Sequence, residues 1–160
     1  MKFKTQIAVA TLAIAASSLL AWSDSGENHT PTIEGVWQVT RRGVDCNDPN
    51  QDRGLPFPAL MTFHRDGTVS GAAKSLVTGP FDTPEYGAWR REQGGQNYSF
   101  RGLQYRYDGN GAFAGSLVLT ANVELTDANS FVYSAAIQLA NANGDPITTL
   151  CGRATGTRFE

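Results

Sequence analysis

The sequence carries little charge and no long apolar segment beyond its first residues. Charged residues make up 18% of the 160 residues, and the formal net charge is −2. Two of the 13 basic residues, Lys2 and Lys4, lie in the N-terminal segment. The rest of the chain therefore has 11 basic residues against 15 acidic ones. The basic surface that binds nucleic acid is therefore missing, and we expect no nucleic-acid partner.

Signatures of catalysis and metal binding are also scarce. The sequence has no G-x-S-x-G nucleophile elbow and no phosphate-binding glycine loop. His64 could act as a base oriented by Asp66, but a turn histidine is the better interpretation. Asp45, Asp48 and Asp52 match no EF-hand spacing, so solvated acids are favoured over a calcium site. We therefore expect no catalytic residue, no metal and no cofactor.

The first 23 residues have the anatomy of a signal peptide. Lysines precede an apolar run from Ile7 to Ala21, and small or polar residues follow from Ser23. This run is shorter than the roughly 20 residues of a membrane-spanning helix, so we expect no transmembrane segment. Trp22 stands where a lipoprotein signal needs its lipid-bearing cysteine, which argues against a lipid anchor. We expect cleavage after Ser23, a flexible linker at 24–32, and export to the periplasm or the extracellular space.

Only two cysteines, Cys46 and Cys151, are present. In an exported protein an even count favours a disulfide. We therefore predict a Cys46–Cys151 disulfide that joins the beginning of the folded region to its end. The alternative is two buried free thiols.

The rest of the chain is typical of short strands joined by turns. Seventeen glycines, eight Phe and five Tyr favour β-structure over helices. Alternating apolar and polar residues predict strands at 33–42, 59–64, 68–74, 86–92, 97–107, 113–125, 131–139 and 147–159. In the fifth strand Tyr98 and Phe100 share one face, whereas Leu103 and Tyr105 share the other. A bulge at 101–102 would reconcile the two phases.

Eight consecutive strands with local turns predict one all-β domain at 33–160, an eight-stranded antiparallel up-and-down β-barrel. Pairing of the last strand with the first would remove both sheet edges. If the first strand runs upward, the long connections at 43–58 and 75–85 both lie at the upper end. The lower turns are tight, so the predicted barrel is a cup with a closed floor.

Gly35-Val36-Trp37 resembles the G-x-W signature on the first strand of lipocalins and other calycins. In those families the Trp plugs the closed end of the barrel, and an Arg from the last strand packs across it. Arg158 occupies a comparable position here, so the resemblance implies a structural, cation–π role for Trp37 and Arg158. The A-T-G-x-R-F ending at 154–159 also looks like that of small exported bacterial proteins.

Eight strands form a barrel that is either filled by side chains or holds one small ligand. Our first hypothesis is a non-catalytic barrel that binds a small, largely apolar molecule through its upper mouth. The predicted ligand-binding residues are Phe57, Phe81, Trp89, Tyr105, Phe113, Leu117, Tyr133 and Ile137. A barrel isomerase or cyclase resembling allene oxide cyclases is the second hypothesis, with polar candidates at Arg101, Arg106, Glu124 and Tyr133. A packed structural or envelope-interaction module is the third, and a cavity at the upper end would argue against it.

Overall fold

The computed structural model describes residues 31–73 and 82–159. The expected signal peptide, linker residues 24–30 and Phe81 lie outside this part of the chain. The described residues form eight strands and no helix, which confirms the predicted all-β class. The strands are β1 (Gly35–Val44), β2 (Asp52–Phe63), β3 (Thr68–Ala73), β4 (Glu85–Arg91), β5 (Asn97–Tyr107), β6 (Phe113–Asp127), β7 (Ser130–Ala140) and β8 (Pro146–Arg158).

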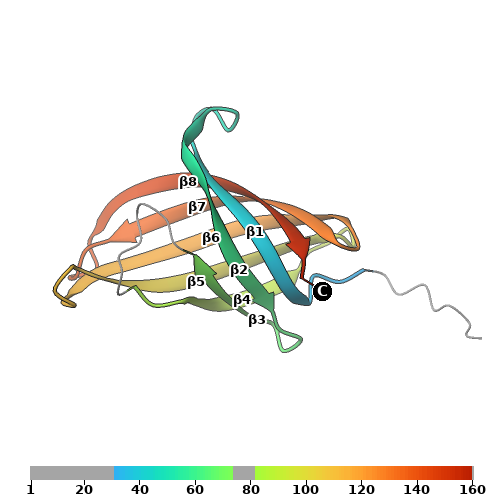
Figure 1. Cartoon of the computed structure of the whole chain (residues 1–160), viewed down its shortest axis with the longest axis horizontal. Coiled ribbons are helices and arrows are strands. Elements are labelled where there is room, and N and C mark those ends of the chain that lie inside the picture. The colour runs from blue at the N-terminus through green and yellow to red at the C-terminus, as the bar shows by residue number, and fades with distance from the viewer. Residues whose placement is uncertain (1–30, 74–81, 160) are drawn as a thin grey trace, which may run out of the picture.

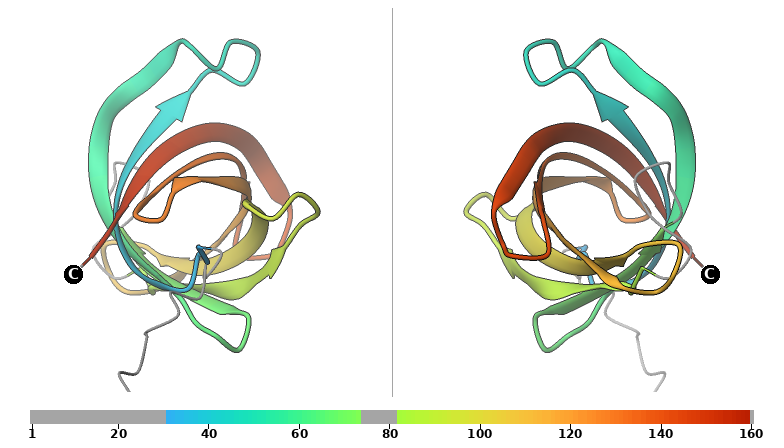
Figure 2. Two further views of the ribbon diagram at one scale, coloured as in Figure 1. Left: turned by 90° about the vertical axis from the view of Figure 1, so that its right-hand side faces the viewer. Right: turned by 90° about the vertical axis from the view of Figure 1, so that its left-hand side faces the viewer.

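The strands close into a single antiparallel barrel in sequence order. Each strand pairs with the next, and β8 pairs back onto β1 from Trp37↔Arg158 to Val44↔Cys151. The end-on views in Figure 2 show the resulting ring of strands. This closed eight-stranded arrangement confirms the predicted up-and-down barrel and fits a lipocalin-like fold. Within the described residues no helix is long and apolar enough to cross a membrane.

The β1–β2 hairpin corrects the predicted long loop at 43–58. β1 continues to Val44 and β2 begins at Asp52, so only residues 45–51 connect the two strands. In this short connection the Asp45 N–H donates to the Gln51 carbonyl at 2.9 Å. The extended hairpin projects beyond its neighbours at the top of Figure 1. Paired strand, rather than loop, therefore forms this part of the upper wall.

Two prolines explain why the sequence predicts a loop where the upper part of β2 forms a strand. Pro56 and Pro58 are two residues apart, so their missing N–H donors lie on the same edge of the strand. Pro58 pairs with Thr40 of β1, whereas the pairing of β2 with β3 starts only at Ala59. Pro58 therefore keeps its place in the β1 ladder, whose register shifts between Arg41 and Gly43, and the edge of β2 that carries the prolines has no β3 partner among the described residues.

β5 keeps one alternation along its length, so the bulge predicted at 101–102 is wrong. The register with β6 runs unbroken through Arg101 and Gly102. Gly102 and Gln104 are buried on the inner face, whereas Leu103 and Tyr105 are 37% and 46% exposed. Much of a folded protein's surface is apolar, so large residues on the outer face need no second phase to explain them.

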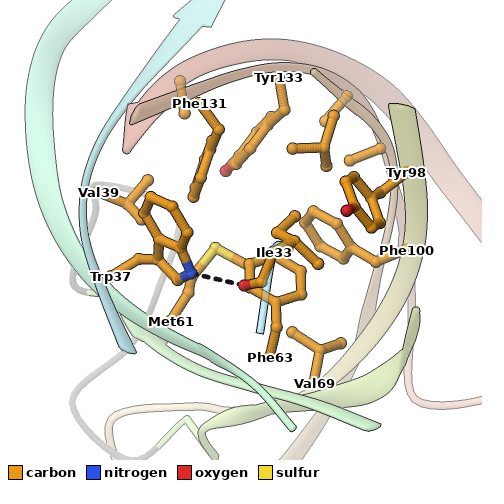
Figure 3. Packing of buried hydrophobic residues seen from close by; sticks show 14 of the residues in the cluster. Ile33, Trp37, Val39, Met61, Phe63, Val69, Tyr98, Phe100, Phe131 and Tyr133 are labelled. Carbon is orange, nitrogen blue, oxygen red and sulfur yellow. Dashed lines mark hydrogen bonds between the residues drawn. The ribbon is translucent and has the colours of Figure 1, made fainter. Parts of the chain in front are cut away.

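Large side chains fill the lower part of the barrel. The largest fully buried side chains are Trp37, Tyr98, Phe63, Phe131, Ile33, Met61 and Leu125. Figure 3 shows Trp37, Phe63, Phe100 and Phe131 pointing into the interior, and the Phe63 ring lies 5.7 Å from Phe100 and 6.1 Å from Phe131. Full burial of one such side chain stabilises the fold by about 1.5–3 kcal/mol. The floor is therefore closed by packed side chains.

The segment before β1 also closes the floor. Ile33 is completely buried, and its carbonyl accepts a 2.8 Å hydrogen bond from Trp37 Nε1. The Arg158 guanidinium lies 4.3 Å from the centroid of the Trp37 ring and donates to the Glu34 and Thr32 carbonyls at 2.6 and 2.8 Å. The left view of Figure 2 shows this segment inside the ring of strands. Arg158 thus joins the start of the folded chain to its last strand.

A disulfide ties the upper hairpin to β8. Cys46 is bonded to Cys151, with their Cα atoms 5.1 Å apart, which confirms the predicted pairing. Val44 pairs with Cys151 in the β1–β8 ladder, so the bond lies beside the seam that closes the barrel. Disulfides form and persist in oxidising compartments, which supports export.

Candidate functional site

A cavity of about 490 Å³ opens at the upper end of the barrel. Its apolar lining is formed by Leu55, Phe57, Leu117, Leu119, Ile137 and Leu150. Arg41, Gln104 and Tyr133 add polar groups to the lining. Tyr133 packs edge-to-face on Phe100, at 5.6 Å between ring centroids, and so marks the base of the cavity directly above the packed floor. The chamber is therefore apolar on its walls and polar at its base.

The cavity forms because the inward-facing residues become smaller above the floor. On β7, Phe131 fills the floor, while Ala135, four residues further up, lines the cavity. Ala73 on β3 and Gly152 on β8 leave space in the same way. Most of the large inward aromatic residues thus lie at the closed end, and small residues leave space for the cavity at the open end.

A buried ion pair lies at the base of the cavity. Arg41 Nη2 donates to Glu85 Oε2 at 2.9 Å, and the two side chains are only 11% and 5% exposed. Arg41 lines the cavity, whereas Glu85 is not part of the lining and lies behind the guanidinium. Burial opposes the charge of Arg41, but Tyr133 and Glu85 hold its pKa above the ordinary value. A buried guanidinium therefore meets the cavity with its counter-charge already in place.

Gly102 makes room for this ion pair. A Cβ atom at Gly102 would lie 2.4 Å from Glu85 Oε1, which is far inside van der Waals contact. Glu85 Oε1 and Arg41 Nε are both buried and have no hydrogen-bond partner among the described residues. Such unpaired buried groups are unusual in proteins and call for an explanation.

Tyr133 and Gln104 complete the polar base. Burial raises the pKa of Tyr133 to about 12, with a smaller lowering by Arg41 and raising by Glu85. The hydroxyl therefore stays protonated at neutral pH and can donate a hydrogen bond. Gln104 Nε2 donates to the Thr83 carbonyl at 2.7 Å, which fixes the amide and leaves its oxygen as an acceptor.

Ion pairs lie along one side of the mouth, on the β1–β2 hairpin and β8. Asp52 accepts hydrogen bonds from Arg42 and, at 2.7 Å, from Arg153 Nη2, while Asp45 accepts one from Arg53. The hydrogen bond from Arg42 holds the pKa of Asp52 below its usual range, and the hydrogen bond from Arg53 does the same for Asp45. These two acids of the sequence cluster are thus paired with arginines. No group of acidic, His or Cys residues in the described part of the chain could hold a metal ion.

Four of the eight residues predicted to bind ligand line this cavity. They are Phe57, Leu117, Tyr133 and Ile137. Trp89 instead packs beside the floor, where its Nε1 donates to the His64 carbonyl at 2.8 Å. Tyr105 and Phe113 contact each other on the outside of the barrel and are 46% and 45% exposed.

The other polar candidates from the sequence do not gather at the cavity. Among the four proposed for an isomerase or cyclase, Tyr133 lines the cavity. Arg106 is half-buried but is not part of the lining, and Arg101 and Glu124 are exposed on the outer face. His64 lies in the β2–β3 turn and is hydrogen-bonded to Ser70 at 3.1 Å. Asp66 accepts hydrogen bonds from Thr68 in the same turn. This turn is at the closed end, away from the mouth.

Sequence reasoning missed Arg41, Glu85 and Gln104. Arg41 has the same strand parity as Trp37 and Val39, so strict alternation on β1 would have placed it inside the barrel. Glu85 falls at the end of the predicted connection at 75–85, and Gln104 falls in the part of β5 assigned to the wrong phase. Their inward positions can be inferred only when the start of β4 and the phase of β5 are known.

No protein-family model matches the chain, and no curated protein matches it significantly.

Proposed function

We propose that this protein is a non-catalytic barrel that binds one small, largely apolar molecule through its upper mouth. The observation that carries the proposal is the cavity of about 490 Å³ with aliphatic and aromatic walls. Pockets for small ligands are typically about 300–1,000 Å³, mostly apolar, and contain a few well-placed polar groups. The upper cavity and its buried base have these properties. An open cavity also argues against a fully packed interaction module.

A lipocalin-like identity accords with the closed end of the barrel. Trp37 lies under Arg158 there, as the G-x-W resemblance implies. This pairing plugs the floor and leaves the upper end as the entrance. In this proposal Trp37 and Arg158 stabilise the cup, and the binding residues are those above them.

Export of the mature chain belongs to the same proposal. The disulfide at the mouth would form and persist in an oxidising compartment such as the periplasm or the extracellular space. Cleavage after Ser23 would release a chain that starts in the linker. The intact mass of the exported protein tests this point, because a retained N-terminal segment would contradict it.

The binding function is tested with the mature protein in two measurements. Native mass spectrometry reports any small molecule that co-purifies with the folded chain. Titration with the fluorescent probe 1-aminoanthracene, followed by displacement with aliphatic compounds, reports binding directly. We expect saturable binding at one site per chain. If neither the probe nor any aliphatic competitor binds, the proposal is wrong.

A further inference from the structure

The polar base of the cavity contains more than an apolar ligand needs. Arg41 and Tyr133 both line the cavity, and Glu85 lies behind Arg41. Burying such polar groups is costly unless they are hydrogen-bonded, and a ligand oxygen at the base would supply that bond to the atoms of Arg41 and Tyr133 that line the cavity. This arrangement indicates that the base recognises one particular end of the ligand.

The charge at the base is already balanced. The Arg41–Glu85 pair is buried, at 2.9 Å, so its net charge is close to zero. A ligand carboxylate would place a second anion next to one guanidinium, in a site where water screens charge weakly. Like charges that share such a site repel each other strongly. The base therefore disfavours an anionic head group.

The groups that face the cavity are mainly donors. The Tyr133 hydroxyl keeps its proton, and Arg41 offers N–H groups only. The Gln104 amide nitrogen is already used by the Thr83 carbonyl, so Gln104 adds an acceptor oxygen to the donors of Arg41 and Tyr133. An oxygen with free lone pairs and no charge satisfies these donors without disturbing Glu85.

From this geometry we infer that the ligand enters with an uncharged carbonyl oxygen first, bound by Arg41 and Tyr133, and leaves its apolar chain against the upper walls. The inference rests on the proposed binding function and names the class of ligand: aliphatic ketones, esters or amides. The apolar residues between base and mouth, among them Leu117 and Ile137, contact the chain. Glu85 acts only through Arg41 and sets the charge that the base accepts.

A matched ligand series tests the inference on the mature protein. 2-Decanone, decane and decanoate have similar chains and differ in the head group. Each is used to displace 1-aminoanthracene. Because a hydrogen bond to a charged donor contributes more than one between neutral groups, we expect 2-decanone to compete at least about ten-fold more strongly than decane or decanoate. Equal competition by all three, or strongest competition by decanoate, would overturn the inference while leaving a binding barrel. No binding of the probe or of any competitor would overturn the proposed function as well.

Two variants test the assigned roles. Tyr133→Phe removes one donor, so it should weaken 2-decanone several-fold and leave decane unchanged. Glu85→Gln leaves Arg41 without its counter-charge and should shift the preference towards decanoate. Glu124→Gln is the matched control, because Glu124 is an exposed carboxylate on the outer face of the barrel. If Glu85→Gln does not fold, the Tyr133→Phe result decides: a parallel loss for decane and 2-decanone would contradict the assigned role.

Discussion

At the level of single residues, Arg158 and Arg41 are stabilised inside the barrel by different partners. Arg158 closes the floor, where its guanidinium stacks on Trp37 and donates to main-chain carbonyls. Arg41 lies higher, next to the cavity, and is held by the carboxylate of Glu85. The first arginine closes the fold, and the second gives the cavity its polarity.

Gly102→Ala tests whether the buried ion pair depends on the space at β5. The added Cβ would come within 2.4 Å of Glu85 Oε1 and force the carboxylate to move. Overpacking of this kind typically costs about 1–3 kcal/mol, and we expect the free energy of unfolding to fall by that amount. Urea denaturation measures it. Gly109→Ala is the control, because a Cβ at Gly109 meets nothing within 4 Å. Equal stability of the two variants would contradict the tight fit at Gly102.

Alkaline pH tests the burial of Tyr133. Its pKa rises from 10.0 to about 12 in the folded state. The unfolded chain therefore loses this proton first as the pH rises. The contribution of Tyr133 to the free energy of unfolding is complete below about pH 10 and is lost as the pH rises through about 12. A pKa shift of this size corresponds to about 2–3 kcal/mol in the free energy of unfolding. We expect the stability of Tyr133→Phe to fall less than that of the wild type across this window. Urea melts at several pH values measure the difference, and parallel curves would contradict it.

At the level of elements, the β1–β2 hairpin determines the shape of the mouth. Its strands extend to Val44 and from Asp52, and its tip is fastened to β8 by the disulfide. Phe57 on the same hairpin lines the cavity. The hairpin is therefore both a wall of the cavity and the element whose position the disulfide fixes.

Removing the disulfide tests this coupling. We expect the double substitution Cys46→Ser and Cys151→Ser to lower the free energy of unfolding by about 2–5 kcal/mol. The β1–β2 hairpin should loosen more than the floor, because the floor is held by packed aromatic rings and Arg158. Thermal melts measure the loss, and hydrogen exchange locates it. Unchanged melting, or faster exchange at the floor than at the hairpin, would argue against the disulfide's role.

Local sequence patterns predicted the strand order and the closed barrel, because turns and alternation are local signals. They also predicted the disulfide, since two cysteines in a chain that is expected to be exported leave one pairing. The predicted loop at 43–58 is wrong because Pro56 and Pro58 normally interrupt strands, whereas here their edge of β2 has no β3 partner among the described residues. The phase of β5 was misjudged because Leu103 and Tyr105 are large and apolar yet face outwards.

The base of the candidate site could not be predicted for a different reason. Arg41 and Glu85 are 44 residues apart in the sequence and meet only through the closed barrel. No spacing rule connects a residue on β1 with one at the start of β4. The alternation of β1 could place Arg41 inside, but its partner depends on the tertiary register.

At the level of the whole molecule, the barrel is a cup with a packed floor, a neutralised polar base and an apolar chamber, with ion pairs along the β1, β2 and β8 side of its mouth. Each layer comes from the inward face of the same strands: large rings below, then Arg41, Gln104 and Tyr133, and small or aliphatic residues above. The central claim is that this chamber binds a small apolar molecule.

The most direct measurement compares 1-aminoanthracene binding to the mature wild type and two β7 variants. Ala135 lines the cavity, whereas the adjacent Ala136 faces outwards and is exposed. We predict that Ala135→Phe, which fills the chamber, lowers the affinity at least about ten-fold, while Ala136→Phe binds like the wild type. Circular dichroism verifies that both variants are folded. Equal binding by the wild type and both folded variants would show that the probe does not enter the chamber, and would contradict the account.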